Sequence, residues 1–154
     1  MEAVKHVSEP YVEILLVEDN PHDLELTMHA LRQHQLANRI HVARNGLEAL
    51  DFLLCRGAFA GRSIADTPKV VLLDLKLPLV DGIEVLRQIK ANPDTQAIPV
   101  VVLTSSREEK DIVETYQLGV NSYIVKPVDF VQFTDAVRQI GLYWVLLNEP
   151  PQIR

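Results

Sequence analysis

The chain has 154 residues, the length of one domain, and its 47% hydrophobic and 23% charged residues are the balance of an ordinary folded protein. Its net charge of −6 argues against a broad affinity for nucleic acid or an anionic membrane, because binding to phosphates needs a basic face. One cysteine excludes an internal disulfide, and without a long apolar run or an apolar leader the expected location is the cytoplasm.

Short apolar segments rich in β-branched residues recur along the chain. Five of them are expected to be strands, at residues 12–17, 39–43, 70–73, 100–103 and 122–125. The third and fourth segments are apolar throughout, which favours parallel strands that are covered by helices on both faces. Periodicity alone also allows a buried helical segment for such runs.

Segments of helical periodicity lie between these strands, and capping residues mark where they begin. Asn20 stands before a proline, Asn45 precedes the second helix, and Asp129 opens the last one. Ser106 begins the sequence Ser-Arg-Glu-Glu, which is typical of a capping box. The alternation predicts a doubly wound (βα)5 domain of the α/β class, with one five-stranded parallel sheet between two layers of helices. In such a sheet the functional crevice lies at the carboxyl ends of the strands.

Charged and hydroxylated residues follow four of the five strands. Glu18 and Asp19 follow the first strand, Asp74 the third, Thr104 the fourth and Lys126 the fifth. Three carboxylates in one crevice need a counter-charge, because like charges raise one another's pKa. A divalent cation, with Mg²⁺ favoured by oxygen-only ligands, or the lysine ammonium could supply it. Such a group suits phosphoryl transfer with an aspartate as covalent acceptor.

The sequence is similar to the receiver domains of two-component response regulators. The residues that carry the resemblance are Glu18-Asp19, Asp74-Leu75-Lys76-Leu77-Pro78 with Asp81-Gly82 after it, Thr104, and Lys126-Pro127. The resemblance covers about residues 12–147. The segment 14–21, the long loop 57–69 and the extended last helix are most similar to the stand-alone regulators that are paired with cyanobacterial phytochromes.

This resemblance implies a flavodoxin-like sheet with strand order 2-1-3-4-5 and a phosphoacceptor site. Asp74 would take the phosphoryl group from the phosphohistidine of a sensor histidine kinase. Mg²⁺, or Mn²⁺ in its place, would be bound by Asp19, Asp74 and the backbone carbonyl of Lys76, with Glu18 holding a metal-bound water. Lys76 departs from the short polar residue usual in this subgroup. Its ammonium could pair with Glu18 or shield the acyl phosphate from water, and we hypothesise that it slows the loss of phosphate.

The same resemblance implies a switch. Thr104 and Lys126 would bind the phosphoryl oxygens, and Thr104 and Tyr123 would change position on activation. The peptide bond before Pro127 would be cis. Two other functions remain open: an aspartyl-phosphate phosphatase or phosphotransferase, whose usual Asp-x-Asp pattern is broken by Lys76, and a receiver-like binding module that works without phosphorylation.

The expected organisation is a flexible arm at residues 1–11, the receiver at 12–147 and a tail at 148–154, with no output domain. Signalling is therefore expected to go through protein contacts, with a downstream protein that the sequence does not identify. In the last helix we expect one buried stripe, formed by Phe130, Phe133, Val137, Ile140, Trp144 and Leu147. A second apolar face is formed by Leu142, Tyr143, Val145 and Leu146. A helix that is apolar nearly all round is deeply buried or packs on a partner. We therefore predict a homodimer through the last helix, the fifth strand and the fourth helix, unless the terminal turns fold back on the chain itself.

Overall fold

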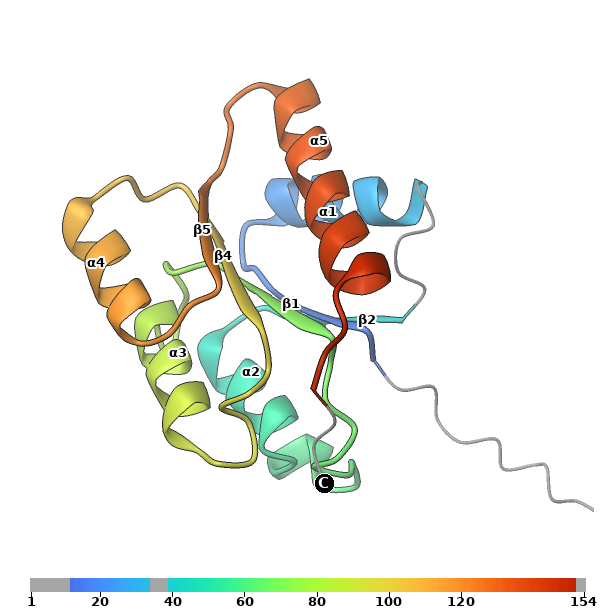
Figure 1. Ribbon diagram of the computed structural model, residues 1–154, viewed down its shortest axis with the longest axis vertical. Coiled ribbons are helices and arrows are strands. Elements are labelled where there is room, and N and C mark those ends of the chain that lie inside the picture. The colour runs from blue at the N-terminus through green and yellow to red at the C-terminus, as the bar shows by residue number, and fades with distance from the viewer. Residues whose placement is uncertain (1–11, 34–38, 152–154) are drawn as a thin grey trace, which may run out of the picture.

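The computed structural model describes residues 12–33 and 39–151, and its centre is a single parallel sheet (Figure 1). The arm predicted at residues 1–11 lies outside the described residues, as do residues 34–38 and 152–154. The strands are β1 (Ile14–Val17), β2 (Ile40–Ala43), β3 (Val70–Leu73), β4 (Val100–Thr104) and β5 (Ser122–Val125). All neighbouring strands are parallel, in the order β2-β1-β3-β4-β5, which confirms the expected sheet.

One α-helix follows each strand. The helices are α1 (Pro21–Gln33), α2 (Gly46–Leu53), α3 (Gly82–Ala91), α4 (Glu109–Gln117) and α5 (Phe130–Gly141), with a short 3-10 turn, η2 (Gly57–Phe59), after α2. The predicted caps Asn20, Asn45 and Asp129 each accept hydrogen bonds from backbone N–H groups of the first turn. The capping box predicted at Ser106 is wrong, because α4 begins only at residue 109. The Ser106 hydroxyl accepts from the backbone N–H of Glu108, outside the helix, and donates to the Asp111 carboxylate. Within the described residues, no helix has the length and apolarity to cross a bilayer.

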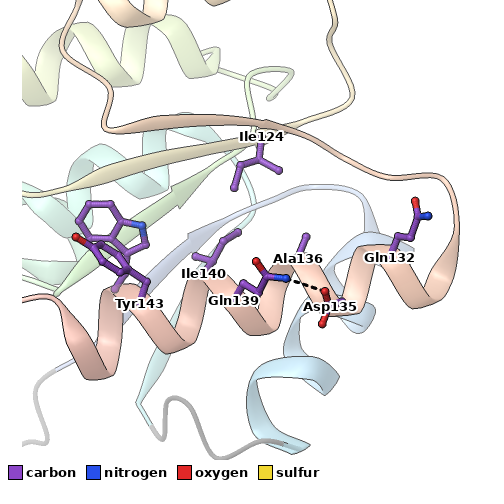
Figure 2. A pocket seen from close by; sticks show the side chains of 8 residues that line it. Ile124, Gln132, Asp135, Ala136, Gln139, Ile140 and Tyr143 are labelled. Carbon is purple, nitrogen blue, oxygen red and sulfur yellow. Dashed lines mark hydrogen bonds between the residues drawn. The ribbon is translucent and has the colours of Figure 1, made fainter.

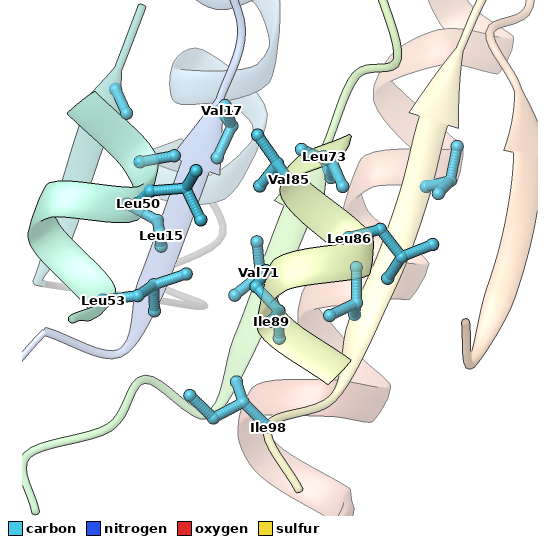
Figure 3. Close-up of a cluster of buried hydrophobic side chains, with 14 of the residues drawn as sticks. Leu15, Val17, Leu50, Leu53, Val71, Leu73, Val85, Leu86, Ile89 and Ile98 are labelled. Carbon is cyan, nitrogen blue, oxygen red and sulfur yellow. The ribbon is translucent and has the colours of Figure 1, made fainter. Parts of the chain in front are cut away.

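Side chains that alternate along the central strands fill two cores, one on each face of the sheet. Leu15 and Val17 of β1 point to the face that α2 and α3 cover (Figure 3). Ile14 and Leu16 point to the opposite face, where α1 and α5 lie. Because successive strand residues face opposite sides, a sheet covered on both faces needs an unbroken apolar run, as β1, β3 and β4 have.

Only the middle of the buried stripe predicted for the last helix is confirmed. Phe130 at one end and Leu147 at the other are 54% and 67% exposed. Beyond α5 the chain continues as a π-helical segment, η3 (Leu142–Leu147), whose wider turn rotates the side chains relative to an α-helix. For that reason Val145, which an α-helical pattern places on the outer face, is buried. The rest of the predicted outer face is exposed: Leu142, Tyr143 and Leu146.

Candidate functional site

Parallel pairing brings the predicted site residues to one edge of the sheet. Because β1 and β3 pair in register, the residues that follow them, Glu18 and Asp74, lie side by side, and the Asp74 backbone N–H donates to the carbonyl oxygen of Val17 over 3.1 Å. At the end of β4, Thr104 is fully buried, and its carbonyl oxygen accepts a 2.7 Å hydrogen bond from the backbone N–H of Lys126. The carboxyl ends of four strands thus form one crevice, as is usual in doubly wound sheets.

The ammonium of Lys126 lies at the centre of this crevice. Its Nζ is 2.8 Å from Glu18 Oε1, 2.8 Å from Asp23 Oδ2 and 2.9 Å from Asp74 Oδ2. An ammonium has three N–H donors and no acceptor, so these three carboxylates use all of them. The residue is only 8% exposed, and solvent therefore screens these contacts weakly.

Burial and ion pairing act in opposite directions on the pKa values of this cluster. Burial would lower the pKa of Lys126, but its hydrogen bonds to Asp23, Glu18 and Asp74 outweigh that effect and raise the pKa. Burial raises the pKa of Glu18 to about 7, with the nearby charge of Asp74 adding to the rise and Lys126 opposing it. One positive charge shared among several carboxylates leaves Glu18 only partly compensated, which is why its pKa stays high.

The acidic residues of the crevice fit a divalent cation. Glu18, Asp19 and Asp74 each offer one oxygen, and these oxygens lie within 4.8 Å of one another. Asp19 is exposed while the other two are buried, so the cluster is open to solvent on the Asp19 side. A donor set made only of carboxylate oxygens suits Mg²⁺ or Mn²⁺, and a cation would offset the excess negative charge.

Lys76 lies beside this cluster but does not join it through its ammonium. Its exposed side chain lines a hollow together with Asp19. The pairing with Glu18 that the sequence suggested is not formed, because Glu18 pairs with Lys126. The Lys76 backbone N–H donates to Asp74 Oδ1 over 3.4 Å, which helps to orient the Asp74 carboxylate. The binding of a metal by the Lys76 carbonyl stays a prediction.

Two glycines hold the loop after Asp74 close to the sheet. A Cβ on Gly82 would lie 2.3 Å from the backbone oxygen of Asp74, and one on Gly46 would lie 1.8 Å from that of Val80. Neither position has room for a side chain. Between them, Leu79 has a φ of 70° and is 76% exposed. This left-handed conformation costs about 1–2 kcal/mol for a residue with a Cβ.

The predicted switch residues are connected through the backbone of Ser106. The Ser106 N–H donates to Thr104 Oγ1 over 3.3 Å, and its carbonyl oxygen accepts a 3.0 Å hydrogen bond from the Tyr123 hydroxyl. The Ser106 hydroxyl donates to Asp111 Oδ2 over 2.6 Å, which joins the loop to α4. Tyr123 is half-buried, and burial raises the pKa of its hydroxyl. The structure thus gives the hydroxyl of Thr104 a short path of hydrogen bonds to β5 and α4.

Two members of the site were not predicted from the sequence, and one backbone detail was predicted wrongly. Asp23 lies in the first turn of α1, and its contact with the distant Lys126 left no local signal in the sequence. Ser106 was interpreted only as a helix cap. No cis peptide bond occurs in the described part of the chain, so the bond between Lys126 and Pro127 is trans, the form of lower energy for most X–Pro bonds.

Comparison with known sequences identifies the family. The family described as the response regulator receiver domain matches residues 14–138, a range that holds every residue of the site. The chain belongs to this family. The probable methanogenesis regulatory protein FilR2 of Methanothrix harundinacea is 43% identical over 96% of this chain and 92% of its own length. The response regulator Rcp1 of Synechocystis sp. is 39% identical over 90% of this chain and 92% of its own.

Solved structures of response regulators share the fold. The Mn²⁺-bound form of Rcp1 has a TM-score of 0.84 at 39% identity, over 92% of this chain and 99% of that chain. The phosphorylated cyanobacterial phytochrome response regulator RcpA has a TM-score of 0.85 at 39% identity, with the same coverage. The bacteriophytochrome response regulator AtBRR is 57% identical, with a TM-score of 0.70, over 91% of this chain and 100% of that chain.

The family assignment settles the class of activity. Receiver domains of this kind are signalling proteins that interact with histidine kinases, and no specific enzyme activity is indicated for this chain. They bind Mg²⁺ or Mn²⁺ at an acidic pocket, and this chain has an acidic cluster at the corresponding edge of its sheet.

Proposed function

We propose that this response regulator accepts a phosphoryl group on Asp74 from the phosphohistidine of a sensor histidine kinase, in a reaction that depends on Mg²⁺ or Mn²⁺. The observation that supports it best is the contact of the Lys126 ammonium with Asp74, 2.9 Å away, beside the carboxylates of Glu18 and Asp19. A buried acceptor carboxylate, a fixed cation and an open acidic cluster are the parts that a phosphoryl-transfer site needs.

The residues of the chain divide the work of the transfer. A carboxylate oxygen of Asp74 attacks the phosphorus, and the P–N bond of the phosphohistidine breaks as the O–P bond forms, leaving its electron pair on the imidazole nitrogen. Lys126 donates to a phosphoryl oxygen, and Thr104 donates its hydroxyl to another. Glu18, Asp19, Asp74 and the carbonyl of Lys76 would hold the Mg²⁺, which supplies further neutralisation of phosphoryl charge when bound.

The input kinase is proposed to be a phytochrome. The support is the match to RcpA and AtBRR, whose names describe them as phytochrome and bacteriophytochrome response regulators. FilR2, which is 43% identical, carries a name from methanogenesis regulation, so sequence identity at this level does not by itself fix the input. The test must therefore compare kinases directly.

Phosphotransfer from purified kinases tests both the acceptor and the partner. A phytochrome histidine kinase and a sensor kinase without a chromophore are each labelled on histidine, then mixed with the wild-type chain or with Asp74→Asn, with Mg²⁺ or with a chelator. We expect label on the wild-type chain in the presence of Mg²⁺, faster from the phytochrome, and none on Asp74→Asn. Label on the variant would contradict the acceptor assignment, and equal rates from the two kinases would contradict the phytochrome pairing.

Phosphorylation is proposed to act through the hydrogen bonds around Ser106. If the hydroxyl of Thr104 turns to a phosphoryl oxygen, the Ser106 N–H loses its 3.3 Å acceptor. The loop that Tyr123 and Asp111 both contact is then free to change its position. A local change of charge thereby biases two arrangements of the surface formed by β5 and α4.

We further propose that the output surface includes a homodimer contact through α5, β5 and α4. A groove of about 420 Å³ runs between β5 and α5 (Figure 2). Its lining residues are Ile124, Gln132, Asp135, Ala136, Gln139, Ile140, Tyr143 and Trp144. Exposed apolar side chains continue from it along η3, at Tyr143, Leu146 and Leu147. A contiguous apolar surface next to a helix end favours association with a second copy.

Sedimentation velocity at tens of micromolar tests the homodimer. Leu146→Glu places a charge on the proposed contact, and Leu47→Glu is the matched control because Leu47, 44% exposed, lies on α2 at the other face of the sheet. We expect a wild-type dimer that Leu146→Glu dissociates and Leu47→Glu does not. A wild-type monomer, or a dimer that survives Leu146→Glu, would count against this interface.

The hypothesis for Lys76 has its own test. Loss of phosphate from the wild type and from Lys76→Asn is followed after removal of the donor. We expect the variant to lose phosphate faster, because the exposed ammonium no longer stands beside the acyl phosphate. Equal rates would refute a role for this side chain in retaining phosphate.

A further inference from the structure

Asp23 is a third carboxylate that contacts the ammonium of Lys126, and it is not part of the acidic cluster of Glu18, Asp19 and Asp74. Its Oδ2 lies 2.8 Å from Lys126 Nζ, as close as Glu18 Oε1 and closer than Asp74 Oδ2. The oxygens that lie together as candidate metal ligands come from Glu18, Asp19 and Asp74. Asp23 therefore contacts the ammonium without belonging to the group that faces a cation.

The number of donors on the ammonium shows what this contact does. Lys126 has three N–H donors, and each has one carboxylate partner. When Asp74 carries a phosphoryl group, the donor that it held turns to a phosphoryl oxygen. Glu18 is shared, because it also faces the cation site. Asp23 is then the one of these three partners that contacts neither the phosphoryl group nor the cation, so it can keep its hydrogen bond to Lys126.

The backbone around Asp23 is held firmly, so its side chain is a fixed support. Its backbone N–H donates a 3.0 Å hydrogen bond to Oδ1 of the cap residue Asn20. Its carbonyl oxygen accepts a 2.8 Å hydrogen bond from the hydroxyl of Thr27, a buried residue one turn further along the same helix. The Asp23 side chain is 22% exposed, against 8% for Asp74, so it reaches Lys126 from the rim of the crevice.

We propose that Asp23 is a positioning residue for phosphoryl transfer, which anchors the ammonium of Lys126 so that one N–H points at the phosphoryl oxygens throughout the reaction. This inference rests on the proposed function of Asp74 as acceptor. Electrostatics alone gives the opposite expectation. Removing a negative charge from an already acidic crevice would help an anionic phosphoryl donor to approach. At saturating Mg²⁺, where weaker cation binding has no effect on the rate, a slower reaction after removal of Asp23 therefore cannot come from net charge.

Three variants separate positioning from charge. Asp23→Ala removes the anchor and the charge. Asp23→Asn keeps an oxygen acceptor of the same shape and loses only the charge. Glu25→Gln is the control, because it removes one charge from an exposed position on the same helix. Rates of phosphorylation by acetyl phosphate with Mg²⁺ are measured for each, and thermal unfolding establishes that the variants are folded.

We expect Asp23→Ala to be phosphorylated about tenfold more slowly than the wild type, which corresponds to the loss of one charge-assisted hydrogen bond from Lys126 at the lower end of its usual strength. Asp23→Asn should recover most of the rate, and Glu25→Gln should match the wild type. Asp23→Ala at or above the wild-type rate overturns the proposal. So does an Asp23→Asn rate as low as that of Asp23→Ala, because the acceptor oxygen would then not be what matters.

A spectroscopic measurement tests the anchor without any phosphoryl donor. In ¹⁵N-labelled protein, the ammonium of a lysine held by carboxylates exchanges slowly with water and gives a sharp signal, whereas a mobile one does not. We expect a sharp Lys126 signal in the wild type and in Glu25→Gln, and its loss in Asp23→Ala. An unchanged signal in Asp23→Ala overturns the anchor. If the wild type accepts no phosphoryl group from any donor, the proposed function fails, and the ammonium signal still decides the role of Asp23.

Discussion

Lowering the pH should weaken Mg²⁺ binding at the acidic cluster within a range where an ordinary carboxylate would have no effect. Burial raises the pKa of Glu18 to about 7, and the neighbouring Asp74 adds to the rise. A proton and a cation compete for the charged carboxylate, so metal binding is coupled to deprotonation of Glu18. As the pH falls through 7, Glu18 takes up a proton and the affinity for Mg²⁺ must fall.

The magnitude follows from the titration of one group. With a pKa of about 7, Glu18 is roughly nine-tenths ionised at about pH 8 and one-tenth ionised at about pH 6, so the affinity should drop about tenfold between them. With the ordinary glutamate pKa of about 4.3, the group would be almost fully ionised at both pH values and the affinity would hardly change. The two cases differ enough for a simple titration to separate them.

Isothermal titration calorimetry with Mg²⁺, repeated with Mn²⁺, measures this dependence. Glu18→Gln is the control, since it keeps the shape of the side chain and cannot titrate, and its affinity should be weaker but nearly independent of pH. The control retains every other titratable group of the chain. A change of less than twofold for the wild type, or the same pH slope in Glu18→Gln, would refute the argument that Glu18 is poorly compensated.

Three substitutions test the backbone and the switch. Gly82→Ala should destabilise the fold by about 1–3 kcal/mol in urea unfolding, because the new Cβ would lie 2.3 Å from the backbone oxygen of Asp74. Gly61→Ala is its control and should be nearly neutral, because no atom lies within 4 Å of a Cβ at that position. Leu79→Gly should stabilise by a few tenths to about 1 kcal/mol in the same assay, since it relieves a left-handed φ at an exposed site, and a loss of stability would contradict the strain. Tyr123→Phe should lose about 1 kcal/mol with its one hydrogen bond, and an unchanged free energy of unfolding would show that this bond contributes nothing.

The fold could be predicted because its signals are local. The runs at residues 70–73 and 100–103 are apolar throughout, and such runs favour strands that are covered on both faces. Capping residues such as Asn45 act within one turn, so their bonds could be anticipated. The strand order was not available from these patterns, because it depends on which faces and edges pack together, and it came from the family resemblance.

The parts of the site that were missed depend on tertiary contacts. Asp23 bonds to Lys126, a residue 103 positions away, and nothing in the local sequence shows that contact. The hydroxyl of Ser106 bonds to Asp111 instead of capping a helix, because α4 begins later than the capping pattern indicates. Val145 is buried in η3, whose π-helical turn a period of 3.6 residues does not describe.

Asp74 is proposed to accept the phosphoryl group with the help of Mg²⁺ and Lys126. Intact-protein mass spectrometry after incubation with acetyl phosphate tests it most directly, on the wild type with Mg²⁺, the wild type with a chelator, Asp74→Asn and Lys126→Ala. We predict a mass increase of one phosphoryl group for the wild type with Mg²⁺, no increase with the chelator or in Asp74→Asn, and a strongly reduced fraction in Lys126→Ala. A wild-type protein that gains no mass, or an Asp74→Asn variant that gains as much as the wild type, would contradict the account.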